Sequence, residues 1–168
     1  MKPVFINKSH DIYETASGSV VVHDRHPDAA VVLAIHEGRM AVIRQYRAGI
    51  GTHTYELPGG AVEASEGPME AARRELLEET GLLARELTPL ASIHSCGHLT
   101  NQIAHLFFAS KTSIHAPQHL DPDEDIQVLF YTIPEVLHQI AGGAWRNPEL
   151  AHGVLLALLH GHIHSGLE

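Results

Sequence analysis

Residues 72–82, ARRELLEETGL, constrain the fold more than any other stretch of this 168-residue chain. Pro68 suits the first position of a helix and Gly81 suits the left-handed cap beyond a last turn, so we predict a helix over residues 68–80. Apolar side chains such as Leu76 form a stripe along this helix, and such a stripe packs against another layer. The helix is therefore expected to lie on a sheet, which holds its charged face in place.

The charged face of this helix is dense in carboxylates. Residues three or four apart share a face, so Glu75, Glu78 and Glu79 are directed to one region, where they repel one another. One interpretation is an ordinary solvated acidic face. The other is a cation site, because the preceding Leu-Pro-Gly-Gly, residues 57–60, allows close approach of backbone and supplies carbonyl oxygens. Such oxygen donors suit Mg²⁺ or Mn²⁺.

Short runs rich in valine and isoleucine surround the helix and predict about six strands. These runs cover residues 19–24, 29–37, 40–47, 90–95, 103–110 and 126–132, and the second and third form a hairpin. A further short strand is expected to run into Pro58. Two more helices are predicted near the C-terminus, one beginning at Pro134 and ending at Gly142, the other capped by Asn147. We therefore expect an α+β fold, an α/β/α sandwich in which helices cover a mixed sheet.

Composition limits the class of protein. With 44% hydrophobic and 18% charged residues, residues 1–168 fit one globular domain whose apolar runs are too short to span a membrane. No secretory signal is apparent, and the single cysteine, Cys96, fits a reducing compartment, so we expect a cytoplasmic protein. The net charge of −9 argues against binding to nucleic acid. A C-terminal histidine group, His160, His162 and His164, has no assigned role.

The residues around the acidic helix resemble the signature of the Nudix hydrolases. Its nine defining positions are all present: Gly60, Glu66, Arg74, Glu75, Leu76, Glu78, Glu79, Gly81 and Leu82. The resemblance implies an enzyme that hydrolyses a nucleoside diphosphate linked to another group, with Mg²⁺ or Mn²⁺ as cofactor. It favours the cation site over the solvated face.

The resemblance also implies a set of metal ligands. Glu75 and Glu79 would be the principal ligands, and Glu78 would join the cluster directly or through water. The carbonyl oxygen of Gly59 would complete the set.

Other residues would support catalysis by the same resemblance. Arg74 and Glu66 would form an ion pair that orients the loop and the helix. A carboxylate in the acidic loop LDPDEDIQV would act as general base, with Glu124 as the candidate and Asp123 and Asp121 as alternatives. A solvated acidic turn is the other interpretation of this loop.

Wider similarity, over about residues 10–160, points to the branch that hydrolyses ADP-ribose and nucleoside diphosphate sugars. Substrate contacts are expected from Gly60 and, before the signature, from Arg44, Arg47 and Glu56. Arg44 and Arg47 lie three residues apart on a strand, so they face opposite sides and only one need reach the substrate. We favour Arg47, although either arginine could instead pair with Glu56.

One segment departs from this branch. Its ADP-ribose enzymes typically carry Ser-Pro-Gly after the signature, followed by a glutamate, whereas this chain has Ser95, Cys96 and Gly97, with Asn101 or Gln102 near the place of the glutamate. The preferred sugar and base are therefore left open. Cys96 is expected to be a small packing residue.

The N-terminal strands of such enzymes commonly help to form a homodimer, so residues 1–28 are predicted to serve dimerisation. The alternative is that they merely extend the sheet. The expected activity is hydrolysis of ADP-ribose or a related nucleotide sugar to a nucleoside monophosphate and a sugar phosphate.

Two alternatives to this activity remain. One is hydrolysis of oxidised nucleoside triphosphates or dinucleoside polyphosphates, and the other is a domain that senses ADP-ribose without cleaving it. Domains that only sense tend to lose signature glutamates, and this chain keeps Glu75, Glu78 and Glu79.

Overall fold

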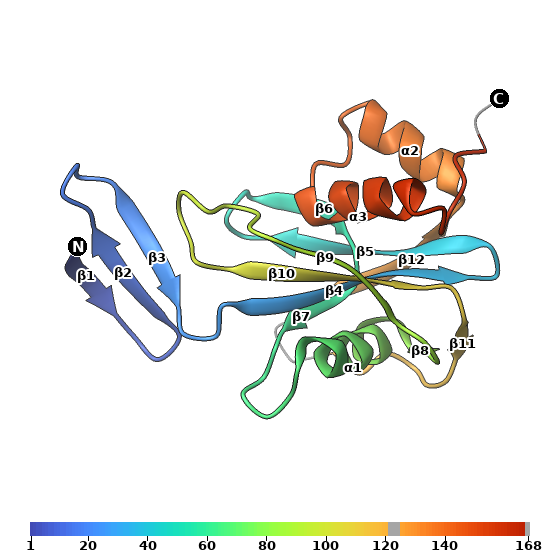
Figure 1. The fold of residues 1–168 in the computed structure, drawn as a ribbon, viewed down its shortest axis with the longest axis horizontal. Helices are drawn as coiled ribbons and strands as arrows, with labels where there is room; N and C mark the ends of the chain where they lie inside the picture. Colours follow the sequence, from blue (N-terminus) through green and yellow to red (C-terminus); the bar gives the residue numbers. More distant parts are fainter. Residues whose placement is uncertain (121–124, 167–168) are drawn as a thin grey trace.

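The computed structural model describes residues 1–120 and 125–166, whose elements are labelled in Figure 1. In chain order they are β1 (Lys2–Ile6), β2 (His10–Glu14), β3 (Val20–Asp24), β4 (Asp28–His36), β5 (Arg39–Arg47), β6 (Thr52–Glu56), β7 (Gly59–Ala61), α1 (Pro68–Thr80), β8 (Leu82–Ala84), β9 (Thr88–Ile93), β10 (Ile103–Ala109), β11 (Thr112–Ile114), β12 (Ile126–Tyr131), α2 (Ile133–Ala141) and α3 (Pro148–Leu159).

A seven-stranded sheet forms the centre of the molecule, with α1 on one face and α2 and α3 on the other, as Figure 1 shows. The strand order is β12-β5-β4-β10-β9, with β6 beside β5 and β7 beside β4. β4 and β10 pair in parallel, and their other neighbours pair antiparallel. The expected mixed sheet between helices is therefore confirmed.

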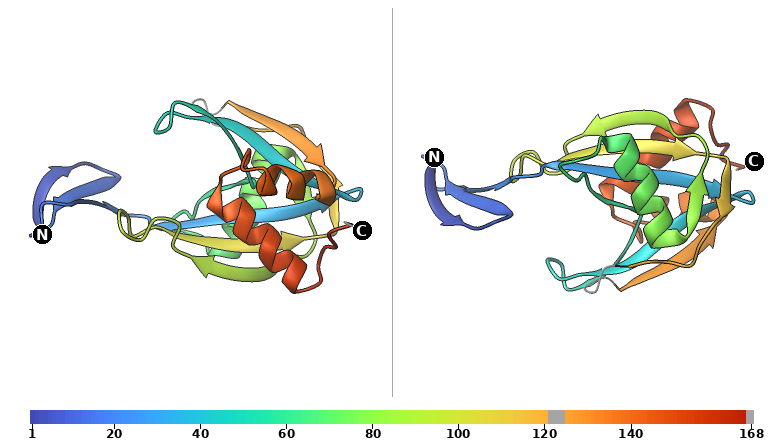
Figure 2. Two further views of the ribbon diagram at one scale, coloured as in Figure 1. Left: turned by 90° about the horizontal axis from the view of Figure 1, so that it is seen from above. Right: turned by 90° about the horizontal axis from the view of Figure 1, so that it is seen from below.

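Alternate side chains of β4 enter two different cores. Val32 belongs to the cluster that includes Leu76 of α1, whereas Leu33 belongs to the cluster that includes Val154 of α3. Both β4 side chains are fully buried. Because the strand is covered on both faces, its sequence reads as one continuous apolar run instead of an alternation. The views from above and below in Figure 2 show this arrangement, with α3 across one face and α1 across the other.

The predicted ends of the helices are confirmed. Pro68 begins α1, and Gly81 follows it with a left-handed φ of 71°, its N–H donating to Leu77 O. Asn147 caps α3 by accepting from the N–H of Leu150 at 2.8 Å. No helix in the described part of the chain is long and apolar enough to cross a membrane.

The prediction of about six strands was too low. The six long runs are present as strands, but β1 and β2 and the three-residue strands β7, β8 and β11 were not predicted individually. The short strands have too few residues for an alternating pattern to be read, and their pairing depends on partners distant in the sequence, as between β8 and β11.

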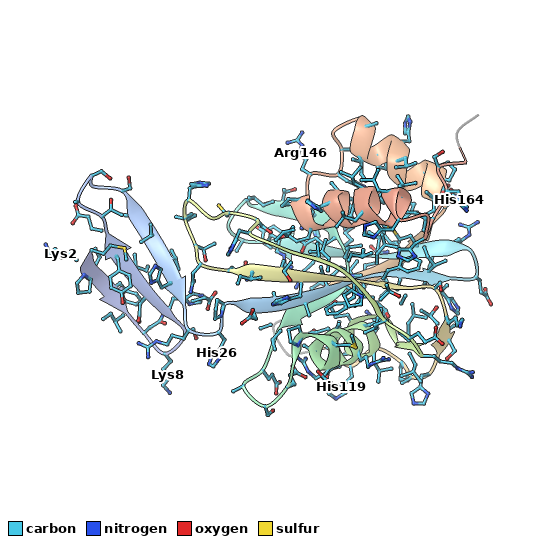
Figure 3. The ribbon with its side chains drawn as sticks, viewed as in Figure 1. Lys2, Lys8, His26, His119, Arg146 and His164 are labelled. Atoms are coloured by element: carbon cyan, nitrogen blue, oxygen red, sulfur yellow. The ribbon has the colours of Figure 1, made fainter. Side chains whose placement is uncertain are left out.

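Strands β1, β2 and β3 form a separate antiparallel sheet that extends away from the central sheet, at the left of Figure 1. Asn101 ties this sheet to the main body, because its side chain accepts from the N–H of Asp24 at 2.7 Å and donates to Asp24 O at 3.1 Å. The N–H of Val22 also donates to Leu99 O. Lys2, labelled in Figure 3, marks the free outer end of this sheet.

Candidate functional site

A pocket of about 310 Å³ opens where two strands share one edge of β4. β7 pairs with residues 29–31 of β4, while β5 pairs with residues 35 and 36. Between these two pairings the β5–β6 hairpin diverges from β4, and residues from both sides of the sheet line the pocket. Glu79 reaches it from α1, Glu149 from α3, and Arg47 from β5.

The two glycines of Leu-Pro-Gly-Gly bring backbone against the acidic helix. A Cβ on Gly59 would lie 2.2 Å from Ala30 O, and a Cβ on Gly60 would lie 2.5 Å from Glu75 Oε1, so neither position has room for a side chain. The N–H of Gly59 donates to Glu79 Oε2 at 2.6 Å. The glycines therefore allow this backbone to lie directly on the carboxylates.

Two of the three predicted carboxylate ligands are buried. Glu75 is 9% exposed and Glu79 is 3% exposed, whereas the side chain of Glu78 is 40% exposed. Buried carboxylates are costly unless they are paired or bind a cation. The burial of Glu75 and Glu79 therefore separates this helix from an ordinary solvated acidic face.

Arg74 connects these carboxylates to the loop before the helix. Its guanidinium donates to both oxygens of Glu66, at 2.6 and 3.2 Å, so the predicted ion pair is present. The same group donates to Glu75 at 2.7 Å, to Glu78 at 3.0 Å and to Ala61 O at 3.0 Å. The hydrogen bonds between Arg74 and Glu66 hold the pKa of Glu66 below its usual value and raise the pKa of Arg74.

The donors near the pocket fit a hard divalent cation in type. The carboxylates of Glu75, Glu78 and Glu79 and the carbonyl group of Gly59 all offer oxygen, which Mg²⁺ and Mn²⁺ prefer. Within residues 1–120 and 125–166, no three His, Cys, Asp or Glu side chains already form a metal-binding group. The structure thus provides the ligand types, while Arg74 holds two of the carboxylates.

The arginine favoured for substrate contact is also the one that pairs with Glu56. Arg47 donates to the two oxygens of Glu56 at 2.9 and 2.7 Å, and both residues line the pocket, whereas Arg44 does not. Burial raises the pKa of Glu56, but the bonds from Arg47 and Thr54 outweigh it, so the pKa lies below its usual value. Glu56 thereby fixes the orientation of the Arg47 guanidinium in the pocket lining.

A second, larger pocket of about 920 Å³ adjoins the first, and the two share Arg47, Glu56 and Asn147. It lies between the β5–β6 hairpin and the loop from α2 to α3. Tyr55 and Arg146 contribute to its lining, and Arg146 is labelled in Figure 3. The two pockets together are large enough for a ligand with two distinct parts.

Part of the first pocket was not predicted from the sequence. Glu149 lines it and accepts a hydrogen bond from the hydroxyl group of Ser95. Gln102, which was expected near the place of the glutamate of the ADP-ribose enzymes, also lines it. Nothing in the local sequence marks Glu149, since an acidic residue in the first turn of a helix is common. The predicted general base, Glu124, and its alternatives in the acidic loop lie outside the described residues.

Known proteins resemble this chain in sequence and in fold. It is 32% identical over 159 residues to the ADP-ribose pyrophosphatase of Bacillus subtilis (strain 168), which covers 90% of this chain and 86% of that protein. It is 34% identical over 118 residues to the methanol dehydrogenase activator of Bacillus methanolicus, covering 69% and 64% of the two chains. The crystal structure of an ADP compounds hydrolase matches in fold, with a TM-score of 0.69, 18% identity and 96% of each chain covered. Residues 24–152 match the NUDIX domain, and the chain therefore belongs to the Nudix hydrolase family.

Proposed function

We propose that this Nudix hydrolase cleaves the pyrophosphate bond of ADP-ribose or a related nucleoside diphosphate sugar. The products would be a nucleoside monophosphate and a sugar phosphate. One observation carries the proposal: the buried carboxylates of Glu75 and Glu79 lie against the backbone of Gly60 and Gly59, and Glu79 and both glycines line a pocket that also contains Arg47. The relative from Bacillus subtilis, which is matched over most of its length, supports the class of substrate.

A divalent metal ion, Mg²⁺ or Mn²⁺, would be held by Glu75 and Glu79, with Glu78 and the carbonyl group of Gly59. When bound, such an ion neutralises the diphosphate and lowers the pKa of an attacking water. The chain prepares this place by burying the two carboxylates against glycine backbone, where no side chain displaces them.

The protein side chains would orient the substrate. Arg47 would bind a phosphate group, because its guanidinium is held by Glu56 at the rim that joins both pockets. Arg74 and Glu66 would act by fixing the loop to α1, since their bonds join the loop to the acidic helix. Glu124 stays the proposed general base.

We also propose that residues 1–168 act as one domain and that residues 1–28 serve a homodimer. β1 supports this proposal, because Val4, Phe5 and Ile6 are all more than half exposed on an edge strand. Apolar edge strands of this kind are normally covered by another chain or blunted by charge. The lone Cys96 fits the proposed cytoplasmic location.

One assay tests the proposed activity. The purified protein would be incubated with Mg²⁺ or Mn²⁺ and with ADP-ribose, GDP-mannose, UDP-glucose, dinucleoside polyphosphates and nucleoside triphosphates, and the products identified by chromatography. We expect a nucleoside monophosphate and a sugar phosphate from at least one nucleotide sugar. Turnover of triphosphates or dinucleoside polyphosphates alone would establish the alternative, and binding of ADP-ribose without turnover would indicate a sensor.

The metal assignment has its own test. Glu79→Gln should lower kcat by about 100-fold or more, because even residues that only orient metal ligands cost 10- to 100-fold when they are replaced. Glu86→Gln is the matched control, since Glu86 is exposed and its ion pair with Lys111 lies on the surface. Full activity of Glu79→Gln would reject the assignment.

A further inference from the structure

A carboxylate that the signature does not supply faces the pocket from α3. We propose that Glu149 selects the sugar part of the substrate by accepting hydrogen bonds from its hydroxyl groups, with Ser95 as a positioning residue. This inference rests on the proposed function, because it assigns a role within the same site.

The chain holds the Glu149 side chain in a defined position. Asn147 caps α3 and Pro148 occupies its first position, so Glu149 stands in the first turn, where the helix dipole stabilises a carboxylate. The hydroxyl group of Ser95, on the loop between β9 and β10, donates to Glu149 Oε1. Within residues 1–120 and 125–166, no donor bonds the other oxygen, Oε2. One oxygen is thus fixed, and one is available to a ligand.

The surroundings of Glu149 suit hydroxyl groups better than phosphates. The same pocket is lined by the amide side chains of Gln102 and Asn147 and by the small side chains of Ala29 and Ala104. None of these carries a positive charge, and a carboxylate repels a phosphate. A carboxylate is, however, a strong acceptor for the hydroxyl groups of a sugar.

The positive and negative side chains in the pocket lining would bind different parts of the substrate. Arg47 is the arginine in the lining, and together with Glu79 and the glycine backbone it marks the place of the diphosphate. The larger adjoining pocket, of about 920 Å³, would take the larger nucleoside, and Glu149 does not line it. The sugar beyond the diphosphate then lies in the smaller pocket, where Glu149 and Gln102 meet it.

ADP-ribose and ADP form a matched pair for the test, because they differ by the terminal ribose. Glu149→Ala should lower kcat/KM for ADP-ribose by about 10- to 100-fold, mostly through KM, since hydrogen bonds to a charged group are lost. The inhibition constant of ADP should change less than about twofold. Ser95→Ala should give a smaller loss in the same direction, and Glu149→Asp should recover part of it. Glu86→Ala serves as the control for the lost negative charge.

Three results would overturn the inference. Equal weakening of ADP and ADP-ribose would place Glu149 on the nucleotide side or show a structural role, which the melting temperature would reveal. An unchanged KM for ADP-ribose would remove Glu149 from the site. If the wild-type protein cleaves no nucleotide sugar, the proposed function fails, and the inference is tested separately. Calorimetry would then measure the binding of ribose 5-phosphate to wild type and to Glu149→Ala, and equal affinities would reject the inference.

Discussion

The central sheet and the N-terminal sheet differ most in what covers them. On β4, Val32 and Leu33 point to opposite faces and are both fully buried, one beneath α1 and the other beneath α3. On β1, Val4 and Phe5 are 61% and 54% exposed. A strand with helices on both sides is stabilised within its own chain, whereas an exposed apolar edge strand is normally covered by another chain or blunted by charge. The difference is the basis for proposing that the N-terminal sheet serves a homodimer.

The largest effect is expected in the central sheet. Leu33→Ala should lower the free energy of unfolding by about 3 kcal/mol, because a fully buried leucine leaves a cavity between the sheet and α3. Leu159→Ala is the matched control: that side chain is 72% exposed, so the change should stay within about 0.5 kcal/mol. Urea denaturation followed by circular dichroism measures both. Similar costs for the two variants would mean that burial between the layers does not determine stability here.

The next effect concerns the N-terminal sheet. Phe5→Asp should raise the dissociation constant of the proposed dimer by about 10-fold or more, because a charge enters an apolar contact. Ser17→Asp adds the same charge at an exposed position in the turn between β2 and β3 and should leave the dissociation constant unchanged. Sedimentation equilibrium provides the measurement. A wild-type protein that is monomeric at every concentration would refute the dimer, and the exposed strand would then need another explanation.

The smallest effect is expected where the two sheets meet. Asn101→Ala removes both hydrogen bonds to the backbone of Asp24, a loss of about 1 kcal/mol that should be local. Hydrogen exchange at the Asp24 amide should become several-fold faster, while the amide of Val32 in the central sheet keeps its rate. Equal acceleration at both amides would show that the two sheets unfold as one unit.

The sequence is most informative where local chemistry determines the structure. Pro68 and Gly81 mark the ends of α1, and the spacing of the signature places Glu75 and Glu79 on one face, as observed. The hairpin of β4 and β5 follows from two apolar runs and a short turn. In each case the deciding residues lie within a few positions of one another.

Other parts of the site could not be predicted because they depend on distant contacts. Ser95 and Glu149 are 54 residues apart, and only the packing of α3 over the sheet brings them together. The sequence left open whether Arg47 or Arg44 pairs with Glu56, because both lie on one strand; the structure pairs Arg47. The five strands not predicted individually include short ones defined by their partners rather than by composition.

The shared edge of β4 has a consequence for how such a protein can change. The tip of the β5–β6 hairpin, residues 48–51, borders the larger pocket but does not pair with β4. Gly59 and α1 are anchored separately, through β7 and the cluster beneath α1. Insertions or deletions at this tip can therefore reshape the larger pocket, the proposed place of the nucleoside, while Gly59 and α1 keep their positions. The hairpin is thus a suitable place to engineer substrate preference.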